Sequence, residues 1–208
     1  MQVGKKILFL CTQTIIMRFI DTHAHIYDET ILPEIEDILK NAISNGVEKI
    51  LMPGINSSCI NDMLSLETKY PQQCIAMMGL HPCYVKENYE QELKIVEDWM
   101  TKRKFVAIGE IGLDFYWDKT FTEQQHKAFE IQMQWAIDYN TPIVIHTRNA
   151  MGETIEAVKP FAKKGLQGVF HCFSGSNESA KEIIKMGFYL GIGGVVTYKN
   201  AGVAEALV

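Results

Sequence analysis

Short apolar runs alternate with amphipathic stretches of helical period along most of the chain. The runs are rich in β-branched and aromatic side chains and predict strands at residues 18–21, 48–52, 75–79, 105–109, 143–146, 169–171 and 188–191. The stretches between them repeat apolar residues at helical spacing and predict helices at residues 33–45, 57–69, 90–102, 122–139, 152–163 and 177–186. This alternation of strand and helix is typical of a parallel α/β fold.

The predicted helix ends carry the residue types that end helices. Ser57, Thr122 and Ser176 stand where a side-chain oxygen can accept hydrogen bonds from the free amides of a first helical turn. Gly46 and Gly187 follow predicted helices, at positions where the chain usually needs a left-handed conformation. These residues support the predicted helix boundaries.

The polar side chains between the elements decide between an open sheet and a closed barrel. An open sheet binds ligands at one switch point, usually behind a Gly-rich first turn, whereas a barrel collects ligands at the carboxyl ends of many strands. Here the first turn reads Thr-His-Ala-His, and the weak Gly-Ile-Gly-Gly run at residues 191–194 comes only at the last predicted strand. Polar residues that end or follow predicted strands are His23, His25, His81, Glu110, His146 and His171. We therefore expect a TIM-type (β/α)₈ barrel.

Length and composition are those of one globular domain. The 208 residues are 47% hydrophobic, which is enough to bury a single sizeable core. Residues 1–16 combine Lys5 and Lys6 with a short apolar run, but they contain no small-residue cleavage site. We expect residues 1–16 to be an N-terminal extension outside the domain, and residues 17–208 to form the domain.

Charge and cysteine content narrow the class of protein. The formal net charge of -5 argues against a protein that holds long nucleic acid through a broad basic surface, although it allows an enzyme that grips a strand end. Five cysteines without CxxC spacing do not suggest a disulfide framework and favour a reducing, cytoplasmic location. No stretch approaches the roughly 20 apolar residues that span a bilayer, so we expect no membrane partner. Oligomeric state stays open.

The His-x-His pair after the first predicted strand indicates a metal site. In an extended chain His23 and His25 project to the same side, where both imidazoles can bind one cation. Histidines at strand ends are common without a metal, but three other strand ends add Glu110, His146 and His171. We expect His23 and His25 to hold one divalent ion and His146 and His171 to hold a second. Glu110 would lie between the two ions.

Two ions that share a carboxylate suit phosphoester hydrolysis, because at roughly 3.5–4 Å apart they stabilise both the attacking and the leaving oxygen. The predicted catalytic residues are Glu110 and His81, the latter as a substrate contact or an acid–base group before Pro82. Arg148 is expected to bind a phosphate through two hydrogen bonds, and Lys199 to add a second positive charge.

The segments DTHAH, MMGLHP, AIGEIGLDFYWD, PIVIHTRNA and VFHCFSG together resemble the successive signatures of TatD-family metal-dependent deoxyribonucleases, within the amidohydrolase-like superfamily. The resemblance runs from Met17 onward. It implies a TIM-type barrel, divalent ions (Mg²⁺, Mn²⁺ or Zn²⁺) and hydrolysis of DNA, often as an exonuclease. The positions that match the family's metal ligands are His23, His25, Glu110, His146 and His171. Asn149 departs from the acidic residue often found there, which is expected to affect substrate contacts.

A second departure lies at the end of the sequence. The family supplies a further metal ligand and base, an Asp in a Glu-Thr-Asp segment on strand eight, and residues 17–208 contain no such segment. A whole barrel typically has roughly 250 residues. We therefore expect a C-terminally truncated barrel without its eighth strand and last helix.

Two alternatives to a deoxyribonuclease remain open at this point. The first is an amidohydrolase that opens a cyclic amide or lactone and uses a carboxylated lysine as the bridge between its ions. Lys104 precedes the fourth predicted strand at its wrong end for that role, which favours the Glu-bridged type. The second alternative is an inactive, truncated metal-binding fragment, which would retain metal and lack turnover.

Overall fold

Parallel strands form the inner layer of the protein. The computed structural model describes residues 18–199, 202 and 204, so the expected N-terminal extension at residues 1–16 lies outside the described part. Within that part the strands are β1 (Phe19–Asp21), β2 (Val47–Met52), β3 (Cys74–Ala76), β4 (Ile108–Asp114), β5 (Ile143–Arg148), β6 (Gly168–Phe170) and β7 (Tyr189–Leu190). They pair in the orders β1-β2-β3 and β4-β5-β6-β7, every pair parallel. An isolated bridge between Met78 and Ile108 joins the two sets.

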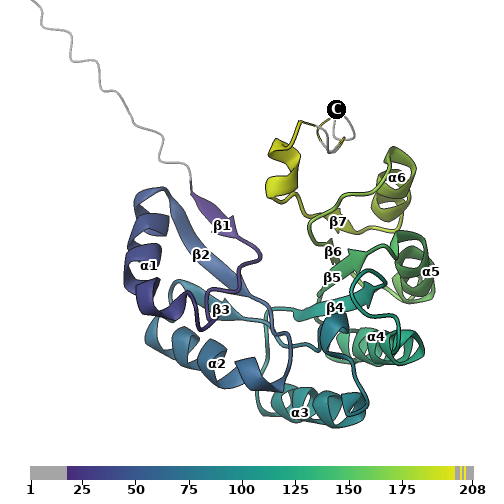
Figure 1. Cartoon of the computed structure of the whole chain (residues 1–208), viewed down its shortest axis with the longest axis horizontal. Helices are drawn as coiled ribbons and strands as arrows, with labels where there is room; N and C mark the ends of the chain where they lie inside the picture. Colours follow the sequence, from purple (N-terminus) through teal and green to yellow (C-terminus); the bar gives the residue numbers. More distant parts are fainter. Residues whose placement is uncertain (1–17, 200–201, 203, 205–208) are drawn as a thin grey trace, which may run out of the picture.

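Helices cover the outer side of the strands, so that Figure 1 shows an arc of β/α units with β1 on one arm and β7 on the other. The helices are α1 (Ile35–Ser44), α2 (Ile60–Lys69), α3 (Tyr89–Lys102), α4 (Thr122–Asp138), α5 (Met151–Ala162) and α6 (Asn177–Lys185). Short 3₁₀ helices are η1 (Leu32–Glu34), η2 (Ser57–Cys59), η3 (Pro82–Tyr84) and η4 (Gly194–Thr197). No helix in the described residues is long and apolar enough to cross a membrane. Strand–helix alternation with parallel pairing confirms the predicted α/β barrel class.

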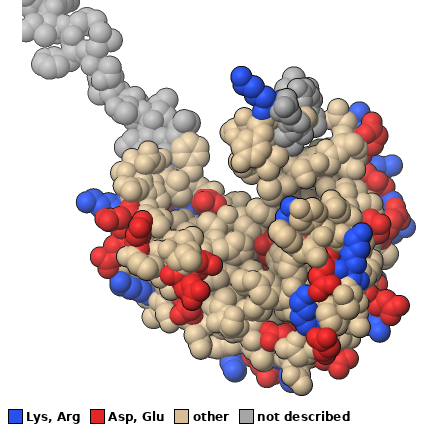
Figure 2. Space-filling view, viewed as in Figure 1, with Lys and Arg blue, Asp and Glu red and all other residues tan. Residues whose placement is uncertain are grey.

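The core lies between the strands and the helices. Helix α4 contributes Phe129 and Met133, and strand β6 contributes Phe170; all three side chains are fully buried. Burying a side chain of this size stabilises the fold by about 1.5–3 kcal/mol relative to leaving it exposed. Charged residues gather over the outer helices with both signs interspersed, and Figure 2 shows no broad basic face on the side in view.

Two buried glutamines of α4 fix the backbone next to the strand exits. Gln132 accepts a hydrogen bond from the Leu80 amide at 2.7 Å and donates to the Leu80 carbonyl at 3.1 Å. Gln125 does the same for Asp114, at 2.9 and 3.1 Å. Because a buried backbone group without a partner is costly, each glutamine holds one strand exit in place. Leu80 directly precedes His81, so α4 fixes the backbone next to His81 as well as at the end of β4.

Strand β4 is longer and later than predicted. The sequence predicts a strand at residues 105–109 with Glu110 behind it, but β4 runs to Asp114 with all seven residues buried. The prediction was wrong because glycines weaken strand propensity, whereas burial and pairing with β5 outweigh that preference here. At Gly112 the φ angle is 145°, and a Cβ atom would lie 1.9 Å from the His146 carbonyl oxygen. Only glycine fits there, so Gly112 is what lets β4 run close beside β5.

The helix boundaries agree with the predicted signals in part. The Ser176 hydroxyl accepts from the Ser179 amide at 3.3 Å and caps α6 as predicted. Gly46 and Gly187 follow α1 and α6 with φ angles of 85° and 87°, again as predicted. Ser57 and Thr122 do not cap. Asn56 accepts the hydrogen bonds at the start of η2, and Thr122 is already the first residue of α4.

Candidate metal centre

His23 and His25 meet Glu110 across the inner face of the strands. The chain leaves β1 at Asp21, whose Oδ1 atom accepts a hydrogen bond from the His23 amide at 3.0 Å. Oε2 of Glu110 lies 3.1 Å from Nε2 of His23 and 3.4 Å from Nε2 of His25. The two Nε2 atoms are 3.2 Å apart. The pair predicted to share one cation therefore converges on a single carboxylate oxygen.

The second oxygen of Glu110 faces a different histidine. Oε1 lies 3.1 Å from Nδ1 of His146, and the Glu110 amide donates to the Gly54 carbonyl at 2.9 Å, which anchors the residue. Burial raises the pKa of the Glu110 carboxyl, but the surrounding His146, His23 and His25 rings outweigh that effect and hold it well below its usual range. Glu110 is thus a buried anion with one oxygen toward each group of histidines.

His171 joins the His23 side of the site. Its ring stacks on the His23 ring with centroids 3.3 Å apart and an interplanar angle of 10°. The ligand atoms of His23, Glu110 and His171 all lie within 4.8 Å of one another. The sequence predicts that His171 shares an ion with His146, but the stacking places His171 beside His23 instead. Burial, followed by the neighbouring His23, lowers the pKa of His171 to about 4, which keeps its ring neutral near pH 7.

Asp114 is a site residue that sequence reasoning missed. Its Oδ2 atom lies 2.8 Å from Nε2 of His146, whose Nδ1 atom faces Glu110. Burial lowers the pKa of His146, yet the hydrogen bonds with the two carboxylates outweigh burial and raise it. A carboxylate behind a metal-ligating histidine is a common arrangement, since it fixes the ring and its tautomer. The available signal was the second acidic residue of the Glu-Ile-Gly-Leu-Asp segment, which the predicted strand end had excluded.

Tyr27 sets the tautomer of His25. Its hydroxyl donates to the Pro53 carbonyl, so its oxygen can only accept from Nδ1 of His25, 2.8 Å away. The proton of the neutral His25 ring is therefore on Nδ1. Nε2 keeps a free lone pair that faces Glu110 and His23, as a metal ligand requires.

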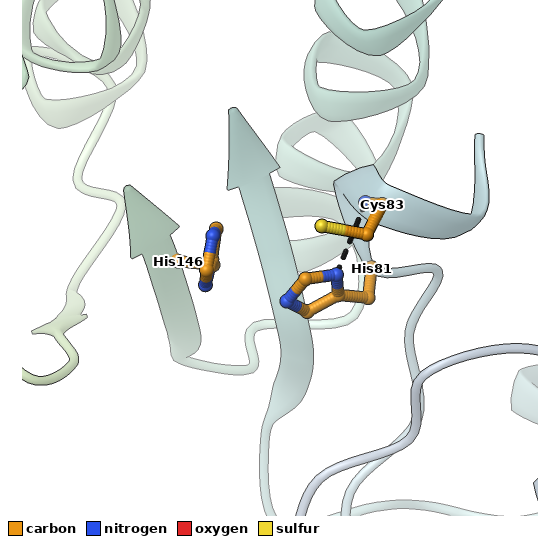
Figure 3. A group of neighbouring side chains, drawn as sticks. All are labelled: His81, Cys83 and His146. Carbon is orange, nitrogen blue, oxygen red and sulfur yellow. Dashed lines mark hydrogen bonds between the residues drawn. The ribbon is translucent and has the colours of Figure 1, made fainter. Parts of the chain in front are cut away.

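His81 has the opposite tautomer. Figure 3 shows His81, Cys83 and His146 together, and their ligand atoms form a second group within 4.8 Å. Nδ1 of His81 accepts a hydrogen bond from the Cys83 amide at 3.1 Å, so the neutral ring carries its proton on Nε2. Burial lowers the pKa of His81 to about 4 and raises that of the Cys83 thiol to about 12. His81 thus presents a neutral N–H donor 3.8 Å from Oε1 of Glu110, which suits a substrate contact better than a metal ligand.

The donors around Glu110 fit divalent metal ions. Nδ1 of His23 is buried and has no hydrogen-bond partner among the described residues. Unsatisfied buried nitrogens are rare, and the same ring has Nε2 only 3.2 Å from another imidazole nitrogen. Imidazoles grouped around a carboxylate are a ligand set that suits Zn²⁺ and related divalent ions.

The two predicted phosphate-binding residues lie apart from this cluster. Arg148 ends β5, two residues after His146, and its guanidinium lies 3.8 Å above the ring of Tyr116. Lys199 lies in an exposed turn after η4. Among the described residues, no hydrogen bond or ion pair connects Lys199 to the histidines. Its proposed contact with phosphate stays a prediction.

Comparison with known proteins identifies the family of the chain. The family model described as TatD related DNase matches residues 20–208. The uncharacterized metal-dependent hydrolase YabD of Bacillus subtilis (strain 168) is 36% identical over 181 residues, which cover 87% of this chain and 71% of that protein. The 3'-5' ssDNA/RNA exonuclease TatD of Erwinia tasmaniensis is 30% identical over 167 residues, covering 80% of this chain and 64% of that protein.

Among solved structures, the TatD homologue YjjV of Escherichia coli K12 superposes with a TM-score of 0.85 at 30% sequence identity. The match covers 93% of this chain and 75% of that one. A family model that spans most of the chain, a shared barrel fold and a histidine–carboxylate cluster at the strand exits agree with one another. The chain therefore belongs to the TatD related DNase family and is a metal-dependent hydrolase.

Proposed function

We propose that this hydrolase cleaves phosphodiester bonds at the ends of DNA strands, as an exonuclease, with two divalent ions (Mg²⁺, Mn²⁺ or Zn²⁺). The observation that carries the proposal is the division of Glu110, with Oε2 toward His23 and His25 and Oε1 toward His146. A shared carboxylate of this kind is suited to two ions. The proposed ligands are His23, His25, Glu110, His146 and His171.

The bound ions would supply an activated water and offset the charge that develops on phosphorus. The protein's own groups orient the site and bind the substrate. Tyr27 and Asp114 fix the rings of His25 and His146, and His81 offers its Nε2–H as a donor to a phosphate oxygen. Arg148, at the end of the strand that carries His146, is the proposed contact to a neighbouring phosphate.

Two observations favour nucleic acid over a cyclic amide or lactone. The carboxylate between the histidines is Glu110, whereas the carboxylated-lysine type needs a lysine there, and Lys104 lies ahead of β4 at the far end of the strand. The Erwinia tasmaniensis relative is by name an exonuclease for single-stranded DNA and RNA. DNA is accordingly the proposed partner.

The test is cleavage of an end-labelled DNA oligonucleotide with Mg²⁺ or Mn²⁺. We expect stepwise shortening that stops in EDTA, and a loss of at least about 100-fold in Glu110→Gln, since metal-ion stabilisation contributes several kcal/mol. Glu130→Gln is a matched control, because Glu130 is exposed on α4. Metal binding without cleavage of DNA would contradict the proposal. Turnover of a lactone would then identify the amidohydrolase alternative, and no turnover at all the inactive metal-binding fragment.

A further inference from the structure

Two large aromatic side chains are exposed directly after β4. Tyr116 is 51% exposed and Trp117 is 67% exposed. Their rings pack edge to face, with centroids 4.9 Å apart and an interplanar angle of 85°. Exposed aromatic pairs beside a functional site often mark a surface that binds a partner or ligand, because burial against it would remove apolar area from water.

Asp114 couples this pair to the metal centre. Its Oδ1 atom accepts hydrogen bonds from the amides of Tyr116 and Trp117, at 2.9 and 3.0 Å. Its Oδ2 atom lies 2.8 Å from Nε2 of His146. One buried carboxylate therefore holds both the turn that carries the aromatic rings and a histidine of the site.

The segment that follows is braced on the neighbouring loop. Lys86 forms an ion pair with Asp118 at 2.6 Å, and its ammonium group lies 5.4 Å from the centroid of the Phe121 ring. The turn is thus held at both ends, by Asp114 and by Asp118. Such preorganisation lowers the entropy lost when a ligand binds.

Arg148 adds a positive charge to the aromatic pair. Its guanidinium lies 3.8 Å from the centroid of the Tyr116 ring and 5.1 Å from that of the Trp117 ring. The Arg148 carbonyl accepts from the Phe115 amide at 2.9 Å, which fixes the strand end under the rings. The ion pairs of the described residues do not include Arg148. Its charge is therefore available to an anionic ligand.

The Tyr116 and Trp117 rings beside Arg148, which forms no ion pair among the described residues, suit single-stranded nucleic acid as the ligand. Bases of single strands can stack on aromatic rings while their phosphates contact arginine, whereas the bases of a duplex stay stacked on one another. A protein partner could also pack against the rings, but its binding would not depend on nucleic-acid bases. We propose that Tyr116 and Trp117 form a stacking platform for an unpaired base of a single-stranded substrate, with Arg148 on the adjacent phosphate; this rests on the proposed function.

The experiment measures the contribution of the bases to binding. Two labelled strands of equal length and charge are compared by fluorescence anisotropy in Mn²⁺ buffer: a cleavage-resistant phosphorothioate oligothymidylate and its abasic counterpart. Because stacking contributes about 1–3 kcal/mol per base, the wild-type chain is expected to bind the oligothymidylate about 5- to 150-fold more tightly. Trp117→Ala is expected to bring this ratio close to one, whereas Trp117→Phe keeps most of it.

Two controls separate stacking from charge and from general damage. Arg148→Gln is expected to weaken both strands equally, since it removes a phosphate contact. Tyr139→Ala removes another exposed aromatic ring, beyond the end of α4 near Arg103 and Phe105, and is expected to leave the ratio unchanged. An unaltered ratio in Trp117→Ala, equal wild-type affinity for the two strands, or no binding of either strand would overturn the platform. If base-dependent binding persists but the chain cleaves no DNA, the proposed function fails and the platform stands.

Discussion

The phenolic oxygen of Tyr27 lies 2.8 Å from Nδ1 of His25, and this contact sets which nitrogen of His25 faces the metal centre. The Tyr27 proton is committed to the Pro53 carbonyl, so the His25 ring must donate through Nδ1. Burial raises the pKa of Tyr27 well above its ordinary value, and the phenol stays protonated. A tyrosine outside the cluster thereby keeps the Nε2 lone pair of His25 available.

Removing that hydroxyl is expected to weaken metal binding. Tyr27→Phe keeps the buried ring but frees the His25 ring to rotate or change tautomer, and loss of such a supporting contact typically costs about 10- to 100-fold in metal affinity. Titration with Mn²⁺ or Zn²⁺ measures the effect. Tyr70→Phe is the control, because the Tyr70 hydroxyl only approaches Glu36 at 3.4 Å on the surface. Equal affinities in wild type and Tyr27→Phe would contradict the assigned tautomer.

Asp114 is expected to act through His146. In Asp114→Asn the side-chain oxygen can still accept hydrogen bonds from the backbone amides of Tyr116 and Trp117. The NH₂ group then faces Nε2 of His146 and cannot accept a hydrogen bond from it. We expect kcat to fall by about 10- to 100-fold with a much smaller change in KM, because the histidine changes and the aromatic turn does not. Steady-state kinetics on an oligonucleotide separate the two constants. A change confined to KM would show that Asp114 serves only the turn.

Gln132 is expected to matter for stability because it satisfies both backbone groups of Leu80 inside the core. Gln132→Met keeps the side-chain volume but leaves a buried N–H and C=O unpaired, at a cost of roughly 2–4 kcal/mol in the free energy of unfolding. Urea denaturation checks the value. Gln134→Met on the same helix removes only an exposed hydrogen bond to Asp138 and should change stability by less than about 1 kcal/mol.

Metal ions are expected to stabilise the fold. The buried Nδ1 of His23 without a partner and the close approach of His23 and His25 are unfavourable in the metal-free protein. A free ion concentration of 100 times the Kd would add about 2.7 kcal/mol to the free energy of unfolding. Calorimetry would detect this as a higher Tm with the ion than in EDTA. His171→Gln should reduce this shift, while His126→Gln, on α4 outside the cluster, should keep it. An identical Tm with and without ions would count against a site at His23.

The barrel was predictable from the sequence because hydrophobic periodicity reports burial directly. The number and order of the strands within residues 18–199 follow that pattern. The end of β4 does not follow that pattern, because Gly112 lowers strand propensity, whereas burial and pairing with β5 continue the strand to Asp114. Gly112 permits this pairing because a Cβ atom there would meet the His146 carbonyl. Local propensity carries no information about such a cross-strand approach.

The cluster was predictable as a set of residues but not as a geometry. Strand-exit positions brought His23, His25 and Glu110 together in the prediction, and the structure has them in contact. The stacking of His171 on His23 depends on how the arc of strands curves, which one sequence does not encode in any local pattern. The opposite tautomers of His25 and His81 depend on groups just outside the signature segments: the Tyr27 hydroxyl, which the Pro53 carbonyl orients, and the Cys83 amide.

The number of divalent ions bound per chain, in wild type and in Glu110→Gln, can be measured by titration calorimetry with Mn²⁺. Since Glu110 directs one oxygen to His23 and His25 and the other to His146, we predict two ions in wild type. We predict that Glu110→Gln weakens the binding of both, because an amide cannot bridge two cations as a carboxylate does. Two ions bound with unchanged affinity in Glu110→Gln would contradict a bridging role of Glu110.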